Sequence, residues 1–261
     1  MRLIKDDCLN LIPTLKDKSV NMVITSPPYN VDLGNNKYKK DGYNIYQDNK
    51  DHKDYINWLK SVFKALYSKM TDDGRVAINI GDGKNGSIPT HSDVINLMTE
   101  IGYKPYTTII WNKSQVGNRT AWGSFKSPSS PSFPTPFEYI LVFYKKHRKL
   151  QHKGITDIEK QEFIDWSLAI WNFAPETRMK KIGHPAMFPV ELPRRLLKLF
   201  TYQEDVVFDP FMGAGTVGVA CKTLNRKFIG TEIDKTYYNI AKDRIQGNLT
   251  DKELKEKYKG W

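Results

Sequence analysis

An apolar segment that ends in an acid and enters a glycine-rich turn is the strongest chemical signal in this sequence. Residues 208–216 read FDPFMGAGT, and Gly213 and Gly215 permit a tight turn against which a ligand can lie. The helix predicted to begin near Thr216 adds unpaired N–H groups. The next predicted strand ends in Glu232, which can accept hydrogen bonds from ribose hydroxyls. The pattern favours a nucleoside-cofactor site, and the spacing, which is not Gly-x-Gly-x-x-Gly, argues against a nicotinamide cofactor.

A second motif, TSPPYN at residues 25–30, follows a predicted strand, at the end where the active sites of open α/β sheets lie. Pro27 and Pro28 stiffen the loop and leave the preceding carbonyl oxygens free as acceptors. Ser26 offers another oxygen acceptor, and the ring of Tyr29 offers a flat face on which a base can stack. Taken alone, the motif is explained equally well as a proline-rich surface loop.

A third motif, GHPAMFP, covers residues 183–189 and precedes a helix predicted over residues 189–200. Its histidine, His184, is either a capping or core residue, which is the commoner case, or part of the lining of a cofactor pocket. The residue type and its position leave both interpretations open.

Together the three motifs resemble those of the S-adenosylmethionine-dependent DNA amino-methyltransferases of restriction–modification systems. TSPPYN is similar to the catalytic motif of that family, DPFMGAGT to its cofactor motif, and HPAMFP to the segment before the cofactor motif. The order along the chain, with the catalytic motif first, resembles the β group. IIWNKS at 109–114 and FEYILVFYKK at 137–146 also resemble family segments, so the likeness covers most of the chain.

The resemblance implies S-adenosylmethionine as the cofactor and assigns residues to it. Asp7, in the opening KDDC, matches an acid that helps to hold the cofactor adenine. The other implied cofactor-contacting residues are His184, Phe188, Asp209, Pro210, Phe211, Gly213, Ala214, Gly215, Thr216 and Glu232. We expect no metal, because two cysteines as distant as Cys8 and Cys221 form no Cys-x-x-C site.

The implied reaction is direct methyl transfer to an exocyclic amine of a DNA base that is flipped out of the duplex. Ser26 Oγ and the carbonyl of Pro27 would accept hydrogen bonds from the amine, Tyr29 would stack on the base, and Pro28 completes the motif. In the family, SPPY is typical of N4-methylcytosine and DPPY of N6-methyladenine. Ser26 therefore favours the N4 amine of cytosine, and N6-adenine is the alternative. The absence of a Pro-Cys dipeptide argues against methylation of the cytosine ring carbon.

The elements that must position these motifs alternate along the chain. Apolar runs predict strands over Val20–Thr25, 75–80, 106–111, 138–144, 205–208 and 227–232. Helical spacing of apolar residues predicts helices over 55–70, 92–101, 189–200, 216–224 and 236–246. We expect Gly74 to end the first of these helices. The alternation predicts an α/β fold with a largely parallel sheet and helices on both faces, and the resemblance implies a Rossmann-like methyltransferase sheet with a circularly permuted motif order.

Three regions are expected along this fold. Residues 1–113 would form the catalytic half of the methyltransferase domain, 114–181 an inserted target-recognition region, and 182–261 the cofactor-binding half. The candidates for DNA contact in the inserted region are Arg119, Lys126, Lys145 and Arg148, whose side chains could hold phosphates or read guanine edges. The polar segment 31–50 is expected to be a mobile loop near the bound base.

The charge balance points to the same partner. The 261 residues carry 40 Lys and Arg against 29 Asp and Glu, a formal net charge of +11. This surplus favours nucleic acid over an anionic membrane, although on charge alone a basic soluble protein without a polyanionic partner is an equally good explanation. The resemblance makes double-stranded DNA the expected partner. The sequence leaves open whether the protein forms a homodimer and whether a separately encoded restriction endonuclease is its partner. We expect a cytoplasmic protein, because the sequence shows no apolar run suited to a membrane helix, no secretory signal and few cysteines.

Three other functions compete with this interpretation. A DNA-binding protein that has lost catalysis predicts a broken catalytic or glycine motif, and both are intact. RNA and protein-glutamine methyltransferases carry related motifs, often Asn-Pro-Pro-Tyr, but Ser26, the β-type order and the basic middle region favour DNA. A nicotinamide oxidoreductase is opposed by the glycine spacing.

Overall fold

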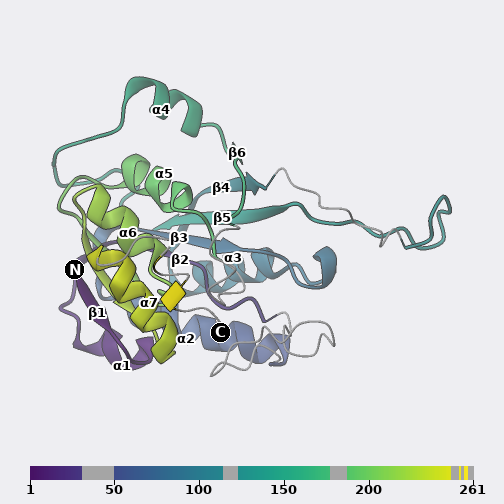
Figure 1. The fold of residues 1–261 in the computed structure, drawn as a ribbon, viewed down its shortest axis with the longest axis horizontal. Helices are drawn as coiled ribbons and strands as arrows, with labels where there is room; N and C mark the ends of the chain where they lie inside the picture. Colours follow the sequence, from purple (N-terminus) through teal and green to yellow (C-terminus); the bar gives the residue numbers. More distant parts are fainter. Residues whose placement is uncertain (31–49, 114–122, 177–186, 248–252, 254–255, 258–261) are drawn as a thin grey trace.

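An eight-stranded sheet in the order β1-β8-β7-β2-β3-β5-β4-β6 forms the centre of the protein (Figure 1). The structure is a computed structural model that describes residues 1–30, 50–113, 123–176, 187–247, 253, 256 and 257. Neighbouring strands pair in parallel, except that β5 runs antiparallel to both β3 and β4. The prediction of an α/β sheet with helices on both faces is confirmed.

The bounds of the elements follow the predicted order. The strands are β1 (Arg2–Ile4), β2 (Val20–Thr25), β3 (Met70–Ile80), β4 (Lys104–Asn112), β5 (Phe137–Tyr144), β6 (Ile170–Asn172), β7 (Val206–Asp209) and β8 (Lys227–Thr231). The helices are α1 (Cys8–Leu11), α2 (His52–Tyr67), α3 (Thr90–Ile101), α4 (Lys160–Trp166), α5 (Glu191–Phe200), α6 (Thr216–Thr223) and α7 (Lys235–Gln246). None of these described helices is long and apolar enough to cross a membrane.

The sheet is covered on both faces, which explains why its strands are continuous apolar runs. Successive residues alternate between two cores: Val23 and Leu141 pack with residues of α1, α2 and α3, whereas Ile24 and Val142 pack with residues of α5, α6 and α7. Figure 1 shows these helix groups around the central strands. Both cores therefore hold the carboxyl ends of the parallel strands in a fixed arrangement.

The prediction that Gly74 ends the first long helix was wrong. Helix α2 ends at Tyr67, and Gly74 lies inside β3, where the register with β2 shifts between Val20 and Met22. A Cβ at Gly74 would lie 2.8 Å from Cε of Met70. Gly74 thus lies in a bulge that shifts the register between β2 and β3, and it does not end a helix.

The middle region of the chain differs from the expected insertion. Strand β5 lies inside the sheet between β3 and β4, where Val142 pairs with Ala77 and Ile140 with Ile109. A segment that supplies a central strand is part of the main sheet. The boundaries 114–181 therefore do not enclose one inserted region, because the described chain leaves the sheet before β5 and again after it.

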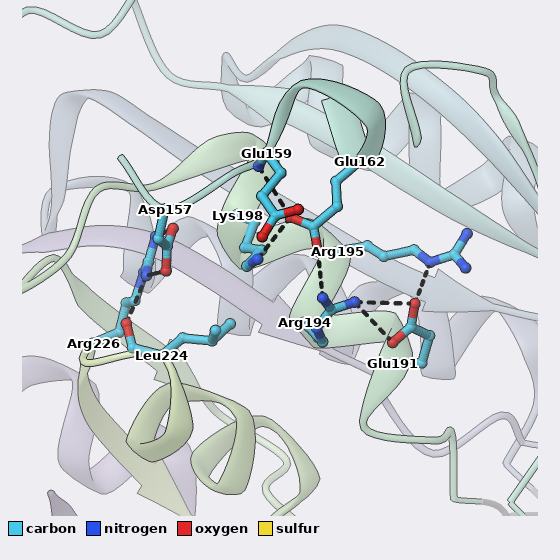
Figure 2. A network of polar contacts seen from close by, with 9 residues as sticks. All are labelled: Asp157, Glu159, Glu162, Glu191, Arg194, Arg195, Lys198, Leu224 and Arg226. Atoms are coloured by element: carbon cyan, nitrogen blue, oxygen red, sulfur yellow. Dashed lines mark hydrogen bonds and ion pairs between the residues drawn. The ribbon is translucent and has the colours of Figure 1, made fainter. Parts of the chain in front are cut away.

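Charged side chains attach α4 and the segment before it to the body of the protein, as Figure 2 shows. Glu162 of α4 pairs with Arg194 and, at 2.6 Å, with Nζ of Lys198, both on α5. Before α4, Asp157 pairs with Arg226, whose side chain is fully buried. Charge-assisted hydrogen bonds of this kind give orientation as well as energy, so α4 is oriented on the face covered by α5.

A histidine between two aspartates links strand beginnings that are distant in the sequence. His152 places Nδ1 3.2 Å from Oδ2 of Asp73 and Nε2 2.9 Å from Oδ1 of Asp205. Burial lowers the pKa of His152, but the hydrogen bonds and charges of the two aspartates outweigh it, so its pKa lies above the usual value. A raised folded-state pKa means that this stabilisation is fully present below the unfolded pKa and is lost as the pH rises through the folded one.

We expect His152→Gln to lower the free energy of unfolding by about 1–3 kcal/mol at pH 6, and by less at pH 9, because only the imidazolium donates to both carboxylates. Urea titrations at the two pH values measure the difference. His147→Gln, at an exposed position of the same segment, is the matched control. A loss of equal size at both pH values would show that the bridge is not charged.

Candidate active site

The carboxyl ends of β2 and β7 meet where the strand order reverses, which is the usual ligand site of an open α/β sheet. A pocket of about 230 Å³ opens there. Of the site residues predicted from the sequence, its lining contains Asp7, Ser26, Pro27, Pro28, Tyr29, Phe188, Asp209, Pro210, Phe211, Gly213, Ala214, Thr216 and Glu232. The fold thus brings together the catalytic and glycine motifs, which are far apart in the sequence.

Among the described catalytic and cofactor residues that the sequence predicted, Gly215 is not in this lining. Gly215 is the N-cap of α6 with φ 79°, and a Cβ there would lie 2.9 Å from Cβ of Ala241. Its glycine character therefore lets α6 pack closely against α7. His184 lies outside the described residues, as do residues 31–49 of the loop predicted over 31–50.

Asp209 joins the two motifs inside the protein. Its Oδ1 accepts hydrogen bonds from Oγ1 of Thr25 at 2.7 Å and from the N–H of Phe211 at 3.1 Å. Burial, together with the nearby charge of Glu232, raises the pKa of Asp209 to about 7, against the lowering effect of these two hydrogen bonds. Because Thr25 directly precedes the SPPY loop, Asp209 holds that loop beside the glycine turn.

Glu232 follows β8 and faces the glycine turn. Its Oε2 accepts from the N–H of Gly213 at 2.8 Å, and its Oε1 accepts from the N–H of Asp234 at 2.9 Å. Burial raises the pKa of Glu232. Each carboxylate oxygen has further lone-pair capacity, so the group can accept hydrogen bonds from a pair of ribose hydroxyls while it orders the turn.

The charged groups of the lining select the kind of ligand. Five carboxyl groups line the pocket, and Lys50 is the cation among the described lining residues; the carboxyl groups are those of Asp6, Asp7, Asp209, Glu232 and Asp234. A pyrophosphate would be repelled by such a lining, whereas a sulfonium and an ammonium would be attracted. The side chains of Trp58 and Phe211, with centroids 5.3 Å apart, supply apolar surface for a purine ring. The residues fit the expected cofactor.

A hydrogen-bond network beside the pocket involves residues that sequence reasoning missed. Ser26 Oγ lies 3.0 Å from the hydroxyl of Tyr29, which lies 3.0 Å from Oε2 of Glu138. Asn79 contacts both Tyr29 and Glu138, and Lys113 pairs with Glu138. A signal was available in the sequence, because Glu138 is an acid at the beginning of an apolar strand, and Lys113 directly follows the neighbouring strand.

The candidates for DNA contact fall in different places. Arg119 lies outside the described residues. Lys126 is exposed on the connection between β4 and β5, with Nζ 5.6 Å from the ring centroid of Phe125. This connection projects far from the sheet in Figure 1, and it starts at the edge where Asn112 pairs with Phe137, which is the edge of the pocket.

Lys145 and Arg148 lie at the opposite edge of the sheet. They follow Tyr144, which pairs with Arg75 near the beginning of β3, whereas the pocket lies beyond the end of β3. Lys145 is 4% exposed and donates to the carbonyl of Met70 at 2.8 Å. Both residues therefore lie at the edge of the sheet away from the pocket, and their contact with DNA stays a prediction.

Comparison with known proteins identifies related sequences. A family model described as DNA methylase matches residues 20–243. The Type II methyltransferase M.MjaVI of Methanocaldococcus jannaschii is 39% identical over 178 residues, which cover 67% of this chain and 87% of that protein. M.MjaI of the same organism is 32% identical over 262 residues, with 88% of this chain and 86% of that protein covered.

Solved structures have the same fold. TTHA0409 of Thermus thermophilus, named as a DNA modification methylase and solved in complex with S-adenosyl-L-methionine, has a TM-score of 0.72 at 25% identity. The match covers 94% of this chain and 95% of that one. The PvuII DNA methyltransferase (cytosine-N4-specific) has a TM-score of 0.70 at 21% identity, covering 98% and 90%, a likeness that concerns the fold alone.

Proposed function

This chain belongs to the DNA methylase family of N6 and N4 amino-methyltransferases, and from this premise we propose that it methylates the N4 amine of cytosine at a specific DNA site. The protein is a DNA methyltransferase, and S-adenosylmethionine is its methyl donor. The observation that carries the cytosine assignment is Ser26, the first residue of an SPPY motif in the lining of the pocket. The alternative product is N6-methyladenine. Matches to Type II methyltransferases support a role in restriction–modification.

In the proposed reaction, the methyl group leaves the sulfonium sulfur and bonds to the amine nitrogen, which afterwards loses one proton to solvent. An exocyclic amine is a weak nucleophile because its lone pair is delocalised into the ring. Ser26 Oγ and the carbonyl of Pro27 would accept hydrogen bonds from its N–H groups and favour a pyramidal nitrogen with a localised lone pair. The ring of Tyr29 would stack on the flipped base and hold it in line with the methyl group.

The cofactor would be held by residues from both halves of the chain. Glu232 would accept hydrogen bonds from the ribose hydroxyls, and Asp7, from the N-terminal segment, would accept from the adenine amine. Phe188 and Phe211 would cover the apolar surface of the purine. The acidic lining favours the positive charges of the sulfonium and ammonium groups, which supports this cofactor over a dinucleotide.

The identity of the product tests the assignment. Purified protein is incubated with S-adenosylmethionine and mixed-sequence duplex DNA, and the DNA is digested to nucleosides and analysed by mass spectrometry. N4-methylcytosine is the expected product. N6-methyladenine would overturn the cytosine assignment but keep the reaction class. Methylation of RNA or protein in place of DNA would point to a different substrate class.

Reversal of the charge at Lys126 is expected to weaken DNA binding several-fold at fixed salt, and to lower the slope of log K against log salt by about 1. The reason is that Lys126 is an exposed cation on a connection that begins beside the pocket. Fluorescence anisotropy with Lys126→Glu at several salt concentrations measures both quantities. Lys104→Glu, an exposed position at the opposite edge of the sheet, is the matched control. Unchanged affinity would remove Lys126 from the DNA-contacting surface.

A further inference from the structure

The directions of the hydrogen bonds beside the pocket can be worked out from the Glu138 carboxylate. An ionised carboxylate only accepts hydrogen bonds, so Oε2 of Glu138 takes the hydrogen of the Tyr29 hydroxyl at 3.0 Å. Tyr29 has one hydroxyl hydrogen, and its oxygen therefore acts as the acceptor for Ser26 Oγ at 3.0 Å. The hydrogen of Ser26 is thus directed at Tyr29.

Asn79 keeps this arrangement from reversing. Its Nδ2 donates to Oε2 of Glu138 at 2.6 Å and to the oxygen of Tyr29 at 2.7 Å. The opposite amide orientation would place Oδ1 against the carboxylate oxygen. In the observed orientation, Oδ1 of Asn79 is buried and has no hydrogen-bond partner among the described residues. The orientation of the Asn79 amide is therefore determined by its hydrogen bonds to Tyr29 and Glu138, and it leaves Oδ1 of Asn79 without a hydrogen bond to any residue that the structure describes.

Glu138 is itself held in place by its neighbours. Its side chain is 12% exposed and pairs with Lys113, which directly follows β4. Glu138 pairs in register with Trp111 of β4, and Nζ of Lys113 lies 5.3 Å from the ring centroid of Trp111. Asn79 of β3 and Glu138 of β5 thus contact the hydroxyl of Tyr29, and Lys113, which follows β4, holds Glu138 in place.

We propose that Glu138 is a positioning residue that acts through Tyr29 to turn the Ser26 hydroxyl, so that its lone pairs face the target amine. The inference rests on the proposed function. A hydroxyl that donated its hydrogen to the amine nitrogen would occupy the lone pair that must attack the methyl group. With that hydrogen drawn to Tyr29, Ser26 Oγ accepts from the N–H of the amine. No proton is transferred along this chain of hydrogen bonds. Its effect is to determine the direction in which the Ser26 hydroxyl points.

Glu138→Gln tests the proposal, because the amide nearly keeps the size of the carboxylate and adds a donor that can face the Tyr29 oxygen. Tyr29 can then turn its hydrogen towards Ser26, which frees the Ser26 hydrogen to point at the amine. Single-turnover methyl transfer is expected to slow about 10- to 100-fold, while the Kd for S-adenosylmethionine stays within about twofold of wild type. Glu138→Asp, which keeps an acceptor, is expected to be faster than Glu138→Gln.

A double-mutant cycle separates positioning from structural support. Tyr29→Phe keeps a ring for stacking and removes the link, so Glu138→Gln should slow Tyr29→Phe by no more than about twofold. Additive losses would overturn the proposal, as would a wild-type rate for Glu138→Gln or a defect confined to cofactor binding. Glu100→Gln, which removes the carboxylate of an exposed ion pair with Lys60, is the control and should keep the wild-type rate.

A failure of the cytosine assignment can be distinguished from a failure of the positioning role proposed for Glu138. The wild-type product, measured in parallel, reports on the choice between cytosine and adenine. The N4 amine of cytosine and the N6 amine of adenine would both present N–H groups to Ser26, so the double-mutant cycle can be measured whichever product is formed. Thermal unfolding of each variant is recorded, and the comparison of Glu138→Asp with wild type in both Tyr29 backgrounds carries the test if Glu138→Gln does not fold.

Discussion

Replacement of Ser26 by alanine is expected to slow methyl transfer about 100- to 1,000-fold, the range seen when one oriented hydrogen-bonding group is removed from a reacting centre. The side chain lines the pocket and its hydrogen is engaged by Tyr29. Alanine removes the acceptor that would localise the lone pair of the amine, and leaves Glu232 and the glycine turn unchanged. The loss should therefore appear in the single-turnover rate and not in the Kd for S-adenosylmethionine.

Ser19→Ala is the matched control for this change. Ser19 precedes the opposite end of β2, and its Oγ donates to the carbonyl of Lys16 at 2.6 Å. The control should keep the wild-type rate. A Ser26→Ala enzyme with an undiminished rate would show that the carbonyl of Pro27 is a sufficient acceptor, and would contradict the role assigned to Ser26.

Replacement of Glu232 by alanine is expected to weaken S-adenosylmethionine binding about 10- to 150-fold, because charge-assisted hydrogen bonds are worth about 1.5–3 kcal/mol. Two effects combine in this change. The carboxylate that would face the ribose is lost, and the N–H of Gly213 loses the acceptor that orders the glycine turn. Isothermal titration calorimetry measures the affinity directly.

At saturating cofactor, the single-turnover rate of Glu232→Ala should fall far less than its affinity, since the residue does not contact the reacting amine in the proposed geometry. Glu100→Ala, at an exposed acid of α3, should bind the cofactor like wild type. An affinity within about threefold of wild type for Glu232→Ala would remove this carboxylate from the cofactor site.

The strands and helices that form the two cores could be predicted from the sequence, because a buried element carries apolar residues at neighbouring or regularly spaced positions. A strand such as β2 is apolar at four of its six positions, and its predicted bounds agree with the structure. The helix that ends before Gly102 was also predicted. Glycine is favoured just after a helix end, and in the structure Gly102 is the C-cap of α3 with φ 111°. The order of the predicted strands and helices is confirmed for the same reason, whereas the short elements β1, α1, α4 and β6 were not predicted.

Strand direction could not be predicted in this way. The apolar run of β5 is the same in either direction, so its antiparallel pairing with β3 and β4 follows from the connection that precedes it. The same uncertainty affected the basic residues Lys145 and Arg148. Their position at the edge away from the pocket follows from the direction of β5 and not from their own chemistry.

The sequence by itself determined the chemistry of this protein: an SPPY motif and a glycine turn, each at the end of an apolar strand, and an acid at Glu232. Those signals are local, since each depends on residues within one turn or one strand. Only the tertiary structure decided that Tyr29 meets Glu138, 109 residues further along the chain. A contact of this kind depends on strand order and register, which are set by the packing of the whole sheet, and so the polar network that orients Ser26 could be seen only in the folded protein.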